Sequence, residues 1–105
     1  MTIEMGILDS DSGEYSVVPV ATVAAFQGVW LPACERLGLE LVPLFGGGAL
    51  TTVPPELVLQ TVAEVERLRS WAAEWQVDSY LADRCSDILA AFARTDPAVC
   101  HYDFG

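Results

Sequence analysis

Apolar side chains occupy alternate positions over residues 2–8, the pattern of a strand with one buried face. A second β-rich run covers residues 15–18. The segment between them, residues 9–14, is rich in Asp, Ser and Gly, which favour turns. The pattern therefore predicts an antiparallel hairpin, and Pro19 is expected to end its second strand because proline cannot donate to a ladder.

Three later segments have apolar residues at every third or fourth position, the spacing of one helix face. These predicted helices cover about residues 21–37, 55–76 and 79–95. Pro32 removes a hydrogen bond from the first helix, so we expect a kink near residues 29–31. The second helix has a packed stripe, which consists of Leu57, Thr61, Val65, Leu68, Ala72 and Trp75. Its other side is expected to face solvent and carries Glu56, Gln60, Glu64, Arg67 and Glu74.

The remaining segments complete a small sheet. A short apolar run at residues 39–45 predicts a third strand next to the hairpin. Residues 46–53 form either a loop or a poorly formed hairpin arm, and the aromatic tail, residues 98–105, either adds a strand or lies over the core. The whole chain, residues 1–105, is therefore predicted to be one α+β domain, with a small, mostly antiparallel sheet covered by three helices.

Charge changes what this fold is expected to do. The 105 residues include fifteen Asp and Glu, five Arg and no Lys, which gives a net charge of −10 on a chain that is 52% hydrophobic. Such a surface repels nucleic acid and anionic membranes and attracts basic proteins, so no nucleic-acid or membrane partner is expected. The alternative is that the charge serves solubility alone.

The cysteines and the N-terminus indicate where the protein acts. Three cysteines, Cys34, Cys85 and Cys100, are an odd number at wide spacings, which fits free thiols in a reducing compartment. No segment reads as a membrane span or a secretion signal. The use of Arg without Lys, together with abundant Ala, Val, Leu and Gly, suggests a bacterial genome of high GC content. We therefore predict a bacterial, cytoplasmic protein.

Candidate catalytic and metal-binding motifs fail on spacing. Asp9, Asp11 and Gly13 resemble the start of a calcium loop, but the glycine stands at the fifth position and no Glu stands at the twelfth. A metal-dependent hydrolase with a site on this loop is a third-ranked hypothesis. The three glycines at residues 46–48 lack the spacing of a phosphate cradle. The single histidine, His101, follows Cys100 directly, and neighbours in an extended segment point to opposite sides. We predict no enzyme, no metal and no cofactor.

Acidic residues on the last two predicted helices are the candidate partner-binding site. If the helices pack antiparallel, their carboxylates form a shared acidic ridge, which partly exposed Trp71 anchors, since Trp is enriched at binding hot spots. The alternative for Trp71 is a wider packed face. The predicted partner-binding residues are Glu64, Trp71, Glu74, Asp78, Asp83 and Asp87.

In size, acidity, absence of Lys and lack of a catalytic constellation, the chain resembles the small immunity proteins of bacterial polymorphic-toxin systems. The resemblance implies an inhibitor that binds a cognate, basic toxin domain and occludes its active or substrate-binding site. It carries over no individual residue. The alternative is a non-catalytic structural or regulatory protein that forms a homodimer through an apolar helix face.

Overall fold

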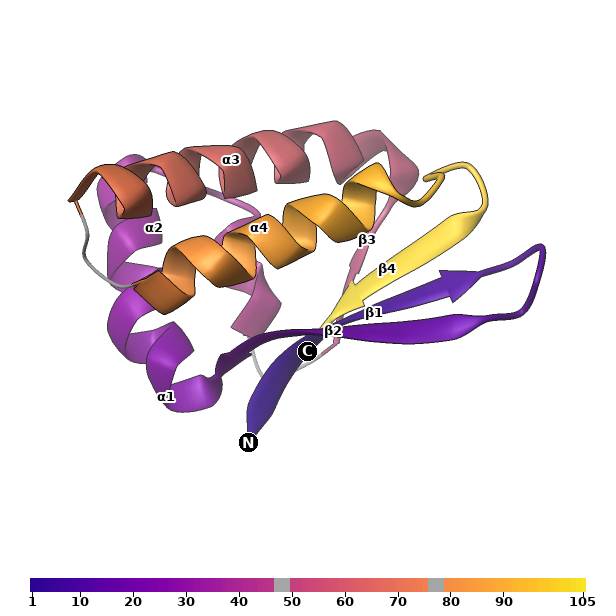
Figure 1. Cartoon of the computed structure of the whole chain (residues 1–105), viewed down its shortest axis with the longest axis horizontal. Coiled ribbons are helices and arrows are strands. Elements are labelled where there is room, and N and C mark those ends of the chain that lie inside the picture. Colours follow the sequence, from indigo (N-terminus) through magenta and orange to yellow (C-terminus); the bar gives the residue numbers. More distant parts are fainter. Residues whose placement is uncertain (47–49, 76–78) are drawn as a thin grey trace.

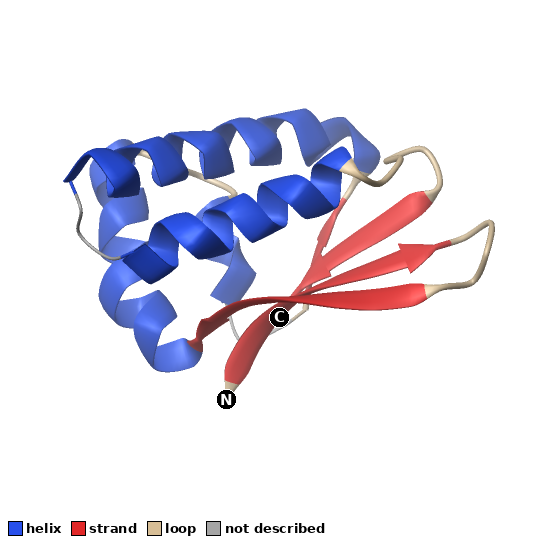
Figure 2. Cartoon of the chain, in the orientation of Figure 1, coloured by secondary structure: helices blue, strands red, loops and turns tan. Residues whose placement is uncertain are grey.

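Alternating apolar residues place one face of each strand against a layer of helices, giving a two-layer α+β structure (Figures 1 and 2). The computed structural model describes residues 1–46, 50–75 and 79–105. The strands are β1 (Thr2–Asp9), β2 (Tyr15–Thr22), β3 (Thr51–Val53) and β4 (Cys100–Phe104). The helices are α1 (Val23–Ala25), α2 (Leu31–Leu37), α3 (Val58–Trp75) and α4 (Ser79–Ala93). The predicted α+β class, antiparallel sheet and three helical segments are confirmed.

The sheet has the strand order β2-β1-β4-β3, and every neighbouring pair is antiparallel. The C-terminal tail is therefore an inner strand of the sheet, and of the two alternatives for it, an added strand or a segment over the core, the first is confirmed. The Phe104 ring stacks on Phe45 with centroids 3.7 Å apart, and the Tyr102 hydroxyl lies 2.8 Å from Thr95 Oγ1. These contacts fix β4 against the helical layer.

The predicted turn between β1 and β2 is confirmed. Asp9 Oδ1 accepts hydrogen bonds from the backbone N–H groups of Asp11 and Ser12, at 2.9 and 3.2 Å. Gly13 has a φ of 75°, which other residues adopt at a cost. The Asp-rich loop therefore uses its first carboxylate as a turn acceptor.

Pro19 does not end its strand, which continues to Thr22, and this expectation was wrong. Pro19 lies opposite Glu4, and Glu4 exchanges backbone hydrogen bonds with Gly105 on the other side of β1, at 3.1 and 3.0 Å. The ring nitrogen of Pro19 therefore faces the free edge of the sheet, where no ladder bond is lost.

The first predicted helix is interrupted just before Pro32, where a kink is expected. Thr22 caps it, with Oγ1 accepting from the backbone N–H three residues on at 3.0 Å. A π-helical turn, Phe26–Trp30, separates α1 from α2, so that Pro32 enters α2 in its first turn, where a missing N–H costs little. Gly38 ends the segment with a φ of 69°.

The predicted strand at residues 39–45 is absent from the structure, which forms a 3-10 helix over Val42–Gly46 instead. The backbone N–H groups of Glu40, Leu41 and Val42 all donate to one oxygen of Glu64 on α3. Because a side-chain carboxylate satisfies these donors, the segment has no need of a strand partner.

α3 begins after a 3-10 turn at Pro55–Leu57, and α4 packs against it in the helical layer. Both helices begin within three residues of their predicted starts, and α4 ends two residues before its predicted end, whereas the predicted end of the first of them, residue 76, lies outside the described residues. Within the described residues, no helix is both long and apolar enough to cross a bilayer.

Candidate functional site

Glu64 does not lie on the solvent side of α3, and its assignment as a partner contact is corrected. Its side chain is 6% exposed. Oε1 accepts from Glu40, Leu41 and Val42 at 3.1, 2.9 and 3.1 Å, and Oε2 accepts from Gln60 Nε2 at 3.2 Å. The carboxylate is used within the fold, as an anchor for the chain after α2.

The sequence contains a signal for this role that the periodicity argument missed. Position 64 lies three residues after Thr61 and four before Leu68, both of which are buried. It therefore borders the packed stripe of α3. An acidic residue in that place needs internal hydrogen-bond donors, and here the turn after α2 supplies them.

Of the two tryptophans at the end of α3, Trp75 departs from its expected position, and Trp71 matches the alternative of a wider packed face. Trp75, placed in the packed stripe, is 62% exposed, because it stands on the last turn of α3. Trp71 is half-buried and packs against the core. The packed face is thus wider at Trp71 than the stripe indicated, and Trp71 keeps part of its surface open.

Trp71 lies in a groove between α2 and α3, which we call the α2/α3 groove. It has a volume of about 510 Å³ and is lined by Leu37, Ala63, Glu66, Arg67, Ser70, Trp71 and Glu74. Leu37 and Trp71, which are half-buried, give the groove apolar surface, and Glu66 and Glu74, which are exposed, give it two carboxylates. Such a groove suits a partner side chain with an apolar stem and a cationic end.

Arg67 is the one cation of the α2/α3 groove, and it is already engaged. Its Nη2 donates to the backbone oxygen of Leu37 at 2.8 Å, at the C-terminus of α2. This position satisfies an open carbonyl and complements the negative end of the helix. Two carboxylates therefore face one fixed guanidinium, and the groove retains net negative charge.

The predicted acidic ridge separates into different areas of the described surface. Of the six predicted residues, Trp71 and Glu74 line the α2/α3 groove, and Asp78 lies outside the described residues. Asp83 and Asp87 are exposed on α4. Asp87 lies 3.7 Å from Arg84, which lines a different cleft, against β2. The groove also includes Glu66, which sequence reasoning had not singled out as a contact.

The acidic side chains point outward with little internal neutralisation. Of the fourteen acidic residues that the structure describes, Glu64 is the one that is buried. Within the same residues, a single carboxylate–guanidinium pair, Arg84–Asp87, comes within 4.0 Å, and both partners are substantially exposed. An exposed pair of this kind contributes little to stability, so the negative surface remains available to solvent or to a partner.

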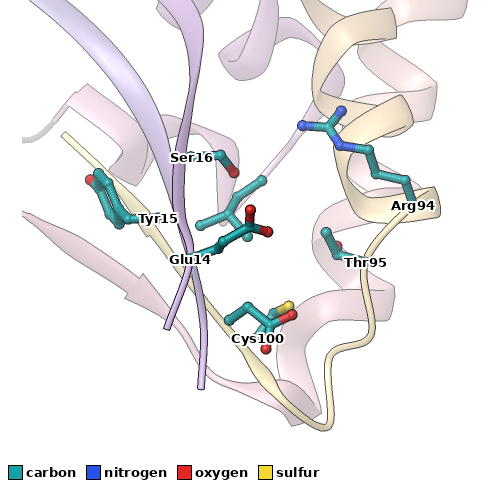
Figure 3. Close-up of a pocket in the computed structure, with 8 residues that line it drawn as sticks. Glu14, Tyr15, Ser16, Arg94, Thr95 and Cys100 are labelled. Atoms are coloured by element: carbon teal, nitrogen blue, oxygen red, sulfur yellow. The ribbon is translucent and has the colours of Figure 1, made fainter. Parts of the chain in front are cut away.

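A second cavity, of about 310 Å³, opens between the tip of the hairpin and the end of α4 (Figure 3). Glu14 and Ser16 line one side, and Arg94 and Thr95 line the other. Cys100 also lines it, but the adjacent His101 is exposed while Cys100 is buried, so the two side chains point to opposite faces of β4. The predicted separation of thiol and imidazole is confirmed, and this cavity offers a polar cleft without a paired nucleophile and histidine base.

The other two thiols, Cys34 and Cys85, are also buried. Burial, and secondarily the charge of Glu64, raises the pKa of Cys34 from 9.0 to about 12. Burial likewise raises the pKa of Cys85 to about 12, although Arg69 acts in the opposite direction. Both side chains are core packing, as their positions on the predicted helix faces indicated.

Comparisons of the chain with protein-family models, with curated proteins and with solved structures find no match in any of the three.

Proposed function

We propose that this chain is an acidic, non-catalytic inhibitor of the immunity type, which binds a basic bacterial toxin and occludes its active or substrate-binding site. The observation that carries the proposal is the outward, largely unpaired set of carboxylates on a chain of net charge −10. Electrostatic complementarity of this kind accelerates encounter with a basic partner and excludes acidic ones. Three free cysteines favour action in the cytoplasm.

The α2/α3 groove is the proposed anchor for the partner. An Arg or Lys side chain of the toxin would lay its stem on Trp71 and place its charge between Glu66 and Glu74. Aromatic anchors surrounded by charge are typical of binding hot spots, since the aromatic ring excludes water from the ion pairs. Asp83 and Asp87 then contribute to long-range attraction rather than to the anchor.

The experiment compares capture by the wild-type chain, by Glu74→Lys and by a matched control, Glu56→Lys, from a lysate of the source cell. Glu56 is exposed in the turn before α3 and does not line the groove. We expect the wild type and the control to retain a basic protein whose toxic activity they inhibit, and Glu74→Lys to bind it about tenfold or more weakly. Both substitutions change exposed side chains, so the fold is preserved in each.

The proposal fails if the protein retained by the wild type is acidic, or if the chain does not reduce its activity. Equal retention of the basic protein by the wild type and by Glu74→Lys would show that the partner is anchored outside the α2/α3 groove. A second comparison, Trp71→Ala against Trp75→Ala, checks the aromatic contribution, because both tryptophans lie on α3 and only Trp71 lines the groove.

A further inference from the structure

Among the described residues, no helix or strand covers one face of the sheet. The helices lie against the other face, as Figure 2 shows. Side chains therefore alternate along each strand, with Met5 and Val18 buried beneath the helices, while Leu8 and Val17 are exposed on the opposite side. An antiparallel sheet tolerates a solvated face when that face is polar.

This face is apolar at one place, which we call the sheet patch: Leu8, Tyr15 and Val17. These side chains are 40%, 64% and 45% exposed. The register pairs Leu8 with Tyr15 and Gly6 with Val17, so the three residues are neighbours on adjacent strands. They form a contiguous apolar area, unlike singly scattered surface residues, and such areas mark interaction sites.

Gly6 shapes the sheet patch. A Cβ at this position would stand 2.5 Å from the Tyr15 hydroxyl oxygen and 3.2 Å from the adjacent ring carbon. The Tyr15 ring therefore lies across the strand over Gly6, in space that any larger residue would occupy. A tyrosine that lies across a sheet in this way supplies contact area at little cost in side-chain entropy.

The carboxylates on the face of the sheet patch are Glu4 and Asp103, and the imidazole of His101 lies next to Leu8 on the same face. Asp9 and Glu14 line the cavity on the helical side of the sheet, together with Arg94. All five arginines lie on helices or, for Arg94, in the turn that closes α4. The segments that build the hairpin and β4, residues 1–22 and 95–105, contain six acids and no Arg or Lys: Glu4, Asp9, Asp11, Glu14, Asp96 and Asp103. Asp103 on β4 pairs with Gly6 on β1, and its Oδ1 accepts a hydrogen bond of 2.8 Å from Thr52 Oγ1. The sheet layer is thus the more uniformly negative of the two layers.

Charge decides which occupant fits the sheet patch. A second copy of the chain, docked face to face, would bring Glu4 and Asp103 of the two copies together on a face that carries no arginine among the described residues. Pairing at the β2 edge is also obstructed, because Pro19 presents no N–H there. A basic segment laid on the face itself meets neither obstacle.

We propose that the sheet patch docks a segment of a protein partner in which Arg or Lys residues alternate with apolar ones. The apolar side chains would cover Leu8, Tyr15 and Val17, and the cations would reach Glu4 and Asp103. The basic character of the partner rests on the proposed function. The surface is new and belongs to the layer opposite the α2/α3 groove, so the two sites are separable by mutation.

The test is an NMR titration of the full chain with a synthetic peptide of about six residues in which Arg and Val alternate, the usual length of a strand. We expect amide shifts to concentrate in residues 4–8, 15–18 and 101–103. Val17→Arg should weaken binding of the peptide about tenfold. The matched control is Leu59→Arg, at an exposed position on α3, and it should leave binding unchanged. Tyr15→Ala is the second variant if the spectrum of Val17→Arg is not that of a folded chain. The same peptide with Glu in place of Arg should not bind.

Other outcomes overturn the inference in distinguishable ways. Amide shifts confined to residues 63–74 would place the peptide in the α2/α3 groove. They would overturn the sheet patch as a docking site and leave the proposed function intact. Concentration-dependent shifts of residues 4–8 and 15–18 without peptide would mean that a second copy occupies the face. If no amide shifts at all, the inference is overturned. If, in addition, the lysate experiment recovers no basic protein, the proposed function is overturned as well.

Discussion

Glu64 fixes the path of the chain between α2 and the 3-10 helix that follows it. One carboxylate oxygen serves three backbone donors, so removing it leaves Glu40, Leu41 and Val42 without their acceptor. We expect Glu64→Ala to lower the free energy of unfolding by about 3 kcal/mol, since partly buried donors are costly to leave unpaired. Urea unfolding measures the loss. Glu66→Ala, at an exposed position two residues on, is the control and should change stability by less than about 0.5 kcal/mol. Similar losses in both variants would contradict the role of Glu64.

The buried thiols predict a loss of stability in alkali. The pKa values of Cys34 and Cys85 are raised from 9.0 in the unfolded chain to about 12 in the fold, so the folded state keeps protons that the unfolded state releases. Their contribution is present in full below pH 9 and declines as the pH rises from 9 to 12. Unfolding free energies measured across this range should fall more gently in Cys34→Ala/Cys85→Ala. Tyr102, whose pKa burial also raises, accounts for part of the slope that remains. An identical slope in the double variant would show that the thiols titrate normally.

At the scale of elements, Gly28 in the π-helical turn and Gly46 in the 3-10 helix differ in whether they leave room for a side chain. A Cβ on Gly46 would stand 2.5 Å from a Phe26 ring carbon and 2.8 Å from Ile3 Cδ1, whereas one on Gly28 would meet nothing within 4 Å. We expect Gly46→Ala to destabilise by about 1–3 kcal/mol through overpacking. Gly28→Ala, in the π-helical turn, should stabilise by about 0.5–1 kcal/mol, because alanine loses less backbone entropy. Thermal unfolding of the two variants checks the signs, and a stabilising Gly46→Ala would mean that the packing around Phe26 is loose.

Elements whose signals are local could be predicted from the sequence. The hairpin, the cap at Thr22, the kink before Pro32 and the helix bounds all follow from residues within a turn of the feature itself. Residues 39–45 could not be assigned in this way, because the Glu64 carboxylate that replaces a strand partner comes from a residue more than twenty positions away.

The candidate site was predictable in part for the same reason. Helical spacing placed Trp71 off the main stripe of α3 and Glu74 on its exposed side, and both line the α2/α3 groove. Leu37 and Glu66 were missed as its other walls, because their role depends on how α2 lies against α3. The division between the groove and the acids of α4 likewise depends on packing that periodicity alone does not encode.

At the scale of the whole molecule, the distribution of charge argues against self-association. The large exposed apolar residues outside the sheet patch are dispersed: Leu44 lies in the 3-10 helix, and Leu59 and Trp75 lie at opposite ends of α3. The sheet patch shares its face with the carboxylates of Glu4 and Asp103. We expect a monomer of 11.3 kDa by light scattering in both about 0.05 M and about 0.5 M NaCl. A dimer that persists at both salt concentrations would instead support the homodimeric alternative.

The outward carboxylates and the basic partner are the centre of the account, and the salt dependence of their association tests it most directly. Titration calorimetry of the purified partner with the wild-type chain should give a dissociation constant that rises at least about tenfold between about 0.05 M and about 0.5 M NaCl, because exposed charges are screened within a few ångströms at high salt. An affinity that stays constant or strengthens with salt would contradict the account, since binding would then depend on apolar contact and not on the acidic surface.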